Sequence, residues 1–257
     1  MGFVFGGISS NEMKIKARIT SWQVLPDIAN NTQTISGKAG VADYGCTSKA
    51  RIINVSCNIY PQKSFGDLVE VLDDVAAWLD PEEGVKQLIF DEIPDRYFEA
   101  RINGQVDCER ILRSAGSFEL SFLCPDPYSY AVKDENFTVE EEGSTVLIRQ
   151  LGNKESYPVY HLSGVIPPGD AYIKINTNGQ VLNIRGPLAE GEVLIIDTSL
   201  LTAKVVDEAG ETLRNGLPLM ENIEFPVLNK GRNELAITCE GAASFVSLRV
   251  QAKSRWR

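Results

Sequence analysis

The chain has 257 residues, 43% of them hydrophobic and 23% charged, which suits a globular protein of one large or, more in keeping with its length, two ordinary domains. No run of 18 apolar residues is present and residues 1–8 lack the pattern of a secretory signal, so we expect no membrane insertion and a protein made and used from the cytoplasm. The net charge is −10, divided as −7 in residues 1–137 and −3 in residues 138–257, an excess of carboxylates that argues against specific binding of nucleic acid.

The first predicted strand carries three basic side chains. Residues 13–19 alternate between apolar and basic positions, so Lys14, Lys16 and Arg18 share the outer face of a half-buried strand. We regard these three as a candidate subunit contact. Residues 20–50 are rich in Asn, Thr, Gly and Ser and are too long for an ordinary loop, so we expect an extended arm, for which reaching a neighbouring subunit is one natural use.

A strand is predicted at 51–60, and one helix at 64–79. Ser64 can cap the helix, with Asp67 three residues further on. Trp78 is expected to be a core residue. The apolar stripe expected to pack on the sheet consists of Phe65, Leu68, Val69, Leu72, Val75, Ala76 and Leu79.

The helix lies within the most acidic part of the chain. Residues 67–95 contain ten carboxylates and the single lysine Lys86, which indicates a negative surface or simply a solvated helix face and loop. Further strands are predicted at 85–90, 97–102 and 111–123, so the first half of the chain is α+β and mostly antiparallel.

The second half shows no helical period. Residues 131–143 are polar and acidic and are interpreted as a linker. Eight short strands separated by turn signals then predict a β-sandwich, at 146–150, 159–163, 171–176, 181–185, 193–197, 203–206, 233–238 and 244–250. Asn178-Gly179 is the strongest hairpin signal, because both residues tolerate the positive φ of a type I′ turn.

Residue types that carry catalysis are sparse. His161 is the only histidine and lies in an alternating strand, so a nucleophilic site would have to be built on it alone. The pattern of a phosphate-binding loop or dinucleotide fingerprint is not present. We expect no enzyme, no cofactor and no metal, and reduced, buried thiols at Cys46, Cys57, Cys108, Cys124 and Cys239, which show no Cys-x-x-Cys spacing.

The segment Phe118–Tyr130, FELSFLCPDPYSY, joins a clean two-residue alternation to a rigid aromatic turn. The apolar positions share one face of a strand, and the two prolines end it because each lacks a ladder donor. The turn is expected to mark the exit from a domain. The candidate structural motif consists of Phe118, Phe122, Cys124, Pro125, Asp126, Pro127, Tyr128 and Tyr130.

Residues 90–130, with this closing turn, resemble the distal tail (Dit) proteins of long-tailed, non-contractile phages. The start of the chain is similar to that family's early strand and glycine-bearing loop, and the second half to its galectin-like domain. These further similarities are carried by residues 6–10, 35–40, 156–160, 231–234 and 255–257.

The resemblance implies a mainly β fold in two domains. Residues 1–137 would form a ring-forming, tail-tube-like split barrel with one helix, and residues 138–257 a galectin-like β-sandwich. It implies a structural hub of the virion tail, assembled in the host cytoplasm as a hexamer, whose partners are the tail tube protein, a tail-tip or tail-associated protein and a receptor-binding protein. The alternative is a lectin-like host-adhesion protein that binds carbohydrate.

Overall fold

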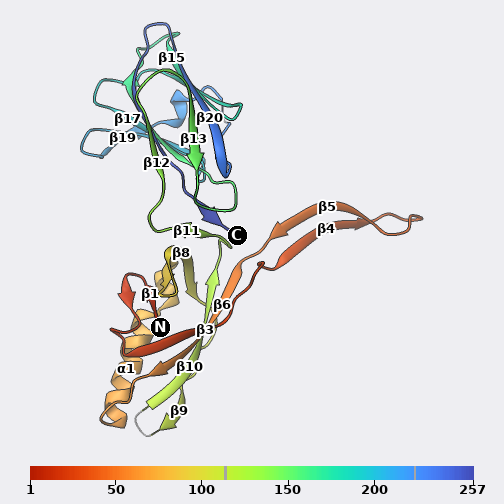
Figure 1. Ribbon diagram of the computed structural model, residues 1–257, viewed down its shortest axis with the longest axis vertical. Coiled ribbons are helices and arrows are strands. Elements are labelled where there is room, and N and C mark those ends of the chain that lie inside the picture. The colour runs from red at the N-terminus through yellow and green to blue at the C-terminus, as the bar shows by residue number, and fades with distance from the viewer. Residues whose placement is uncertain (113–114, 223) are drawn as a thin grey trace. The chain divides into compact units, whose positions relative to one another are not determined.

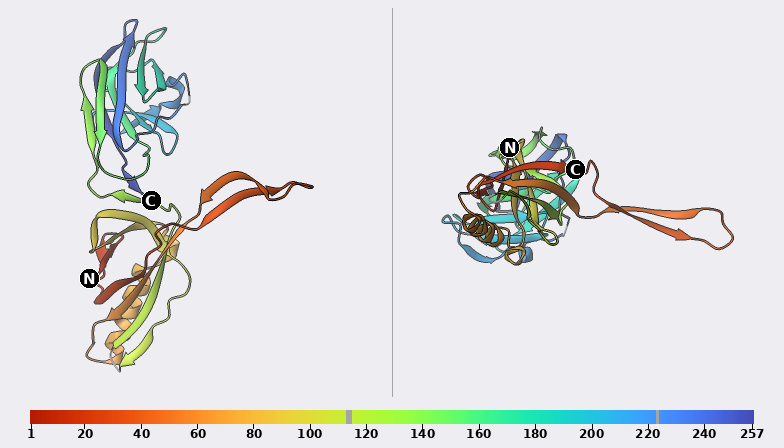
Figure 2. Two further views of the ribbon diagram at one scale, coloured as in Figure 1. Left: turned by 45° about the vertical axis from the view of Figure 1, so that its right-hand side comes forward. Right: turned by 90° about the horizontal axis from the view of Figure 1, so that it is seen from below.

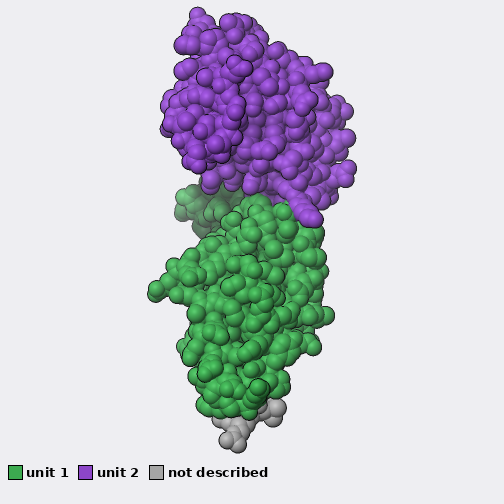
Figure 3. All heavy atoms as spheres, turned by 90° about the vertical axis from the view of Figure 1, so that its left-hand side faces the viewer, with its two compact units in different colours: residues 1–132, 257 green, residues 133–256 purple. Residues whose placement is uncertain are grey.

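The computed structural model describes residues 1–112, 115–222 and 224–257. It divides into two compact units, residues 1–132 together with Arg257, and residues 133–256 (Figure 3). The boundary expected at 137/138 falls within a strand of the second unit, β12 (Asn136–Val139). In the described part of the chain, no helix is long and apolar enough to cross a membrane.

The first unit contains one α-helix among its described residues, α1 (Phe65–Trp78), followed by the short 3₁₀ turn η1 (Pro81–Glu83). Its strands are β1 (Phe3–Phe5), β2 (Ile8–Ser9), β3 (Ile15–Ser21), β4 (Ile28–Thr34), β5 (Val41–Ser48), β6 (Arg51–Ile59), β7 (Lys86–Phe90), β8 (Ile93–Ile102), β9 (Glu109–Leu112), β10 (Ala115–Cys124) and β11 (Ser129–Ala131).

The main sheet of the first unit curls on itself. Its strands lie in the order β2-β1-β7-β8-β10-β6-β3, with β11 also paired to β8 and β9 to β10. Ala17 N donates to Met1 O over 3.3 Å, and Ile15 N donates to Ser10 O over 2.8 Å, so β3 returns to the N-terminal strands. The alternation in β10 is confirmed, because Phe118, Leu120, Phe122 and Cys124 are all buried in one core.

The helix begins as predicted but buries only part of the predicted stripe. Ser64 Oγ accepts a hydrogen bond from Asp67 N at 3.1 Å. The buried residues are Leu68, Val71, Val75, Trp78 and Leu79. The predicted stripe omitted Val71 and included Phe65, Val69 and Ala76, which are exposed. This part of the prediction was wrong because the apolar surface of the helix is wider than its contact with the sheet, and periodicity alone does not choose between adjacent faces.

Trp78 is a core residue, as predicted. Its indole Nε1 donates to Phe5 O over 2.9 Å, and its ring stacks on Phe3 with centroids 5.4 Å apart. A buried indole N–H needs such an acceptor, so this bond fixes the helix against β1.

Two strand predictions in the first unit require correction. The strand predicted at 13–19 begins only at Ile15, because Lys14 closes a turn with a left-handed φ of 58° that no strand residue adopts. The strand predicted at 111–123 consists of two, β9 and β10, which pair with each other. Residues 113 and 114 lie outside the described residues.

The second unit is a sandwich of two antiparallel sheets around one core (Figure 1). One sheet has the order β12-β21-β14-β17-β18-β19 and the other β13-β20-β15-β16. The strands are β12, β13 (Gly143–Arg149), β14 (Val159–Val165), β15 (Tyr172–Thr177), β16 (Gln180–Arg185), β17 (Val193–Asp197), β18 (Thr202–Val206), β19 (Thr212–Asn215), β20 (Gly231–Glu240) and β21 (Ser244–Gln251); the 3₁₀ turn η2 (Leu217–Leu219) and the short strand β22 (Arg255–Trp256) complete the unit.

All eight strand runs predicted in this half are strands. The turn between β15 and β16 is the expected one, since Asn178 and Gly179 have φ of 53° and 88°. The boundary between the two units at 132/133 lies within the linker predicted at 131–143, but the later part of that segment is not a linker: β12 pairs with β21 there, Val139 is buried, and Phe137 packs on the core. The surrounding carboxylates hide this short amphipathic strand in the sequence.

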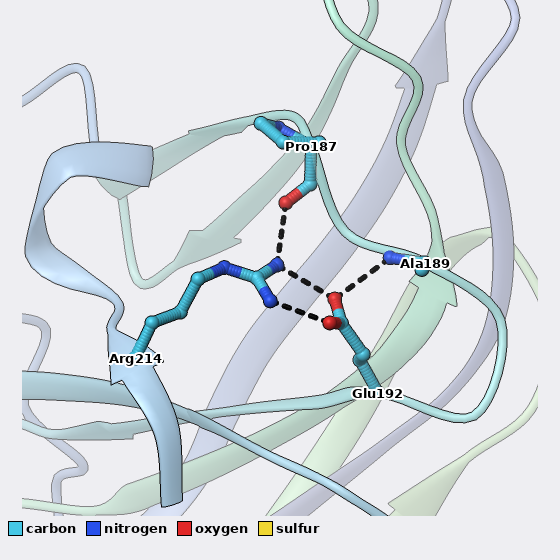
Figure 4. A network of polar contacts seen from close by, with 4 residues as sticks. All are labelled: Pro187, Ala189, Glu192 and Arg214. Carbon is cyan, nitrogen blue, oxygen red and sulfur yellow. Dashed lines mark hydrogen bonds and ion pairs between the residues drawn. The ribbon is translucent and has the colours of Figure 1, made fainter.

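An ion pair links the loop before β17 to β19 (Figure 4). Arg214 Nη1 and Nη2 donate to Glu192 Oε1 and Oε2 at 2.5 and 2.6 Å, and Nη2 also donates to Pro187 O at 2.8 Å. Glu192 Oε2 accepts from Ala189 N at 2.9 Å. The bidentate bond to Arg214 lowers the pKa of Glu192.

We predict that Glu192→Gln destabilises this sheet edge by about 0.5–1 kcal/mol at pH 7, as partly exposed pairs do. Because the folded pKa lies below the ordinary value, the contribution of Glu192 is complete above that value and is lost as the pH falls through the folded pKa. Hydrogen exchange of the full chain, followed by mass spectrometry, should show faster exchange in residues 187–197 and 202–215 at pH 7 but a smaller difference near pH 3. Glu190→Gln, an exposed neighbour, is the control; equal effects of both variants would contradict the prediction.

Candidate functional site: the arm and its root

The segment expected to be an extended arm is a β-hairpin. Strands β4 and β5 pair with each other and with no other strand of the described chain, and a turn at residues 35–40 joins them. We call residues 28–48 the arm. It projects from the first unit as a narrow ribbon (Figures 1 and 2). The turn uses Gly37 and Gly40 at φ of 79° and 86°, which glycine adopts without strain.

The arm and the residues leading into it expose much apolar surface. Six large side chains between positions 22 and 44 are each more than 40% exposed: Trp22, Val24, Leu25, Ile35, Val41 and Tyr44. An isolated two-stranded hairpin is marginally stable in water, and both of its edges offer unpaired backbone groups. The arm therefore has the properties of a surface that another protein covers.

Cys46 lies on this arm and is exposed, and Cys108 and Cys239 are only partly buried, so the expectation that all five thiols are buried holds for Cys57 and Cys124 alone. Both faces of the ribbon meet solvent, and burial does not follow from residue type there. Burial raises the pKa of Cys57 and of Cys124 to about 12, which keeps these two thiols protonated at neutral pH.

Polar contacts close the base of the arm. Lys49 Nζ lies 2.8 Å from Asp27 Oδ2, and Lys49 N donates to Asp27 O over 2.7 Å. The bond from Lys49 lowers the pKa of Asp27. Arg257 Nη2 donates to Ser48 Oγ over 2.9 Å. These bonds fix the separation of the two strands where they leave the domain.

Arg51 connects the arm to the sheet. Its guanidinium is almost fully buried, with Nη1 donating to Gln23 O at 2.8 Å and Nε to Pro127 O at 2.9 Å. The charge lies 5.9 Å from the ring centroid of Trp22 and 5.9 Å from that of Phe98. Burial lowers the pKa of Arg51. We call the contacts of Arg51 with residues 22, 23, 98 and 127 the arm root.

The predicted structural motif forms the other side of the arm root. β10 ends at Cys124, so the two prolines terminate the strand as expected. Asp126 organises the turn: its Oδ1 accepts from Tyr128 N at 3.1 Å, and its Oδ2 accepts from the Tyr130 hydroxyl at 2.5 Å. The Tyr130 ring stacks on Tyr97 with centroids 5.7 Å apart. The turn thereby places the Pro127 carbonyl where Arg51 can donate to it.

The three candidate contact residues are all exposed. Lys16 and Arg18 lie on the outer face of β3, the end strand of the sheet, whereas Lys14 lies in the preceding turn. Within the described chain, none of the three forms an ion pair. They are separate from the arm root, whose central residue, Arg51, was not singled out from the sequence. The only sequence feature that could have indicated Arg51 is its position as a charged residue at the start of the alternating strand 51–59.

The second unit has a polar hollow of about 490 Å³ lined by residues of β13, β20 and β15. Ser144, Asn176, Arg232 and Glu234 contribute polar groups to it, and its lining contains no aromatic side chain. His161 lies elsewhere, on β14, with Nδ1 3.3 Å from Arg249 Nη2. Burial, and secondarily Arg249, lowers its pKa. Among the described residues, no cluster of three His, Cys, Asp or Glu is placed to hold a metal.

Comparison with known proteins identifies the class. Residues 9–124 match the family described as phage tail protein RIFT-related domain. The fold is similar to the crystal structure of the SPP1 Dit (gp 19.1) protein, with a TM-score of 0.73 and 14% identity over 100% of this chain and 99% of that one. Two structures of the phage P2 baseplate in its activated conformation, with Ca and with Sr, match at TM-scores of 0.50 and 0.51, with 11% and 12% identity over 98% of each chain. A search of curated proteins finds no match.

Most of the first unit thus matches a phage tail domain family, and the chain as a whole has the fold of the SPP1 Dit protein. The predicted resemblance to the siphophage distal tail proteins is confirmed at the level of the fold, and the mainly β fold class is confirmed.

We predict that Arg51→Ala loosens the arm root and destabilises the first unit by about 2–4 kcal/mol, because two carbonyls lose a charged donor and a cavity remains. Exchange of the full chain should accelerate in residues 20–27 and 125–131. Arg18→Ala removes an exposed arginine of the same sheet and serves as control. Unchanged exchange in both segments would show that Arg51 does not hold them together.

Proposed function

We propose that this protein is a structural hub at the distal end of a long non-contractile phage tail, where a ring of subunits links the tail tube to the tail tip or baseplate and anchors adhesion components. The observation that carries this proposal is the whole-chain likeness to SPP1 Dit, whose structure is described as a paradigm of the hub adsorption apparatus in phages that infect Gram-positive bacteria.

The arm supports the ring in this proposal. Its exposed apolar side chains and unpaired edges need a covering surface, and a neighbouring copy supplies the same surface to every subunit. We propose a hexamer built from residues 1–137. The acidic surface of residues 67–95 would repel DNA that passes the ring, since phosphate and carboxylate carry like charge.

The second unit would act as the outward, galectin-like part of the hub. In this proposal its partners are a tail-tip or tail-associated protein and a receptor-binding protein, while the first unit stacks on the tail tube protein. The protein would be assembled in the host cytoplasm and remain in the virion tail. The exposed edge strand β13, with Val146 40% and Ile148 58% exposed, gives the sandwich a surface for such contacts.

The alternative is a lectin-like adhesin, and the polar hollow on the sandwich is the observation in its favour. Sugar sites combine convergent polar groups with an apolar or aromatic platform. The hollow supplies Asn176, Arg232 and Glu234 but no aromatic ring, and Arg232 and Glu234 already pair at 3.1 Å. The hub therefore ranks first.

The direct test of the hub is the mass of the purified chain in solution, measured by light scattering over a range of concentrations and paired with electron microscopy. We expect a closed ring with about six times the 28.3 kDa of one chain. A chain that stays monomeric both alone and when mixed with its tail tube protein would contradict the proposal.

The basic residues give a second prediction. Changing Lys14, Lys16 and Arg18 together to Glu should weaken ring formation without unfolding the subunit, because these exposed charges would meet the acidic 67–95 surface of a neighbour. Each such pair contributes about 0–1 kcal/mol, so we expect a weaker ring and slower assembly. The matched control changes three exposed lysines of the sandwich, Lys204, Lys230 and Lys253, to Glu. Assembly equal to that of the unchanged protein would exclude this contact.

Carbohydrate binding separates the two functions. A hub that recognises its host through partners should bind wall polysaccharide with a Kd no tighter than about 1 mM, which corresponds to about −4 kcal/mol. Glycan arrays and calorimetric titration of the full chain measure this. Saturable micromolar binding that Asn176→Ala abolishes, with Asn136→Ala as control, would favour the adhesin.

A further inference from the structure

The first unit contains an apolar groove beside its helix. The groove has a volume of about 360 Å³ and lies between the second half of α1 and the segment that follows β8. We call it the α1 groove. It is lined by the buried Phe118 together with Leu72, Ala76, Leu79 and Val106, of which Val106 is 37% exposed. Leu72 and Ala76 belong to the apolar side of the helix that the core does not fully cover.

Several residues that line the α1 groove are followed or preceded in the sequence by carboxylates. Asp73 follows Leu72 on the helix, Asp80 and Glu82 flank Pro81 at its end, and Asp107 follows Val106 on the opposite side. These side chains are exposed or half-buried. A segment that fills the groove favourably is therefore apolar and carries positive charge.

The tip of the arm has this chemistry. Residues 35–41 expose Ile35 by 43% and Val41 by 57%, with Lys38 between them and no carboxylate in the turn. Ile35 O accepts a hydrogen bond from Lys38 N over 3.1 Å, so the turn holds these residues in one compact tip. The groove volume, in the lower part of the roughly 300–1,000 Å³ that small-molecule sites occupy, suits a few side chains.

The arm projects away from α1, the helix that lines the groove. In each view the arm leaves the domain away from α1 (Figures 1 and 2). An arm cannot reach the groove of its own chain in this conformation. A tip that enters the groove of the next copy makes a head-to-tail contact, which closes into a ring when the rotation between copies permits.

We propose that the α1 groove is the docking site for the arm tip of a second copy of this chain, with Ile35 and Val41 in the groove and Lys38 facing the carboxylates next to its lining residues. This inference rests on the proposed ring and names the surface that each arm contacts.

Photochemical cross-linking in the full chain tests the docking site. Ile35 is replaced by the photoreactive p-benzoylphenylalanine, and equal amounts of ¹⁵N-labelled and unlabelled protein are mixed at the highest soluble concentration. We expect mixed-isotope adducts between the arm tip and residues 72–81 or 102–108. Val106→Asp should reduce their yield at least about tenfold, since a carboxylate in the groove must lose its water.

The control is Val246→Asp, which makes the same change at an exposed valine on β21, outside the groove lining. It should leave the yield of cross-linked adducts unchanged. Adducts at another surface, adducts within single chains only, or no adducts overturn the docking site. A chain whose residues 28–48 are replaced by Asn-Gly separates the two proposals. If this shortened chain still forms rings, the arm does not hold the subunits together. If it forms no rings but the Val106→Asp variant forms normal ones, the arm is needed and only the α1 groove is excluded as its docking site.

Discussion

The buried guanidinium of Arg51 joins segments that lie far apart in the chain. Its hydrogen bonds reach Gln23, which is 28 positions away, and Pro127, which is 76 positions away. Burying a charge costs several kcal/mol after relaxation. Hydrogen bonds from a charged donor return about 1.5–3 kcal/mol each, and aromatic faces about 0.5–2 kcal/mol. These terms nearly cancel, so the main contribution of Arg51 is to orientation: it fixes where the arm leaves the sheet.

One sheet edge of the sandwich is covered by the chain's own residues, whereas the edges of the arm are not. In the sandwich, the free edge of β16 is covered by a following segment, because Asn222 Oδ1 accepts from Asn183 N at 2.9 Å and Asn222 Nδ2 donates to Val181 O. The arm has no such cover within the described chain, and its exposed strands are the kind of edge that soluble monomers avoid. The fold of the first unit is thus complete in its core and incomplete in its arm, as expected for a part of an assembly.

The sequence predicted correctly those elements in which the spacing of apolar residues matches the side chains that are buried. The alternation of β10 and the Ser64 cap of α1 were correct because local chemistry determines both. β4 and β5 could not be predicted as strands, since a ribbon exposed on both faces has no need for alternation, and its run of Asn and Thr looks like a loop. Arg51 could not be predicted as the arm root, because its partners come from distant segments. β12 was not predicted because it has only two apolar residues, and the carboxylates around them made the segment look like a polar linker.

The rigidity of the arm root has a geometric consequence for a ring. Head-to-tail contacts close only if every subunit presents its arm at the same angle, and an error at the root is multiplied by the length of the arm. At about 3.4 Å per residue, the eight residues of β5 extend roughly 27 Å, so a 10° change at the root moves the tip by about 5 Å. That displacement equals the spacing of neighbouring strands. A buried charge with fixed donors is therefore better suited to this position than an apolar residue of equal volume, because a guanidinium bound to two carbonyls allows little rotation whereas apolar packing is not directional.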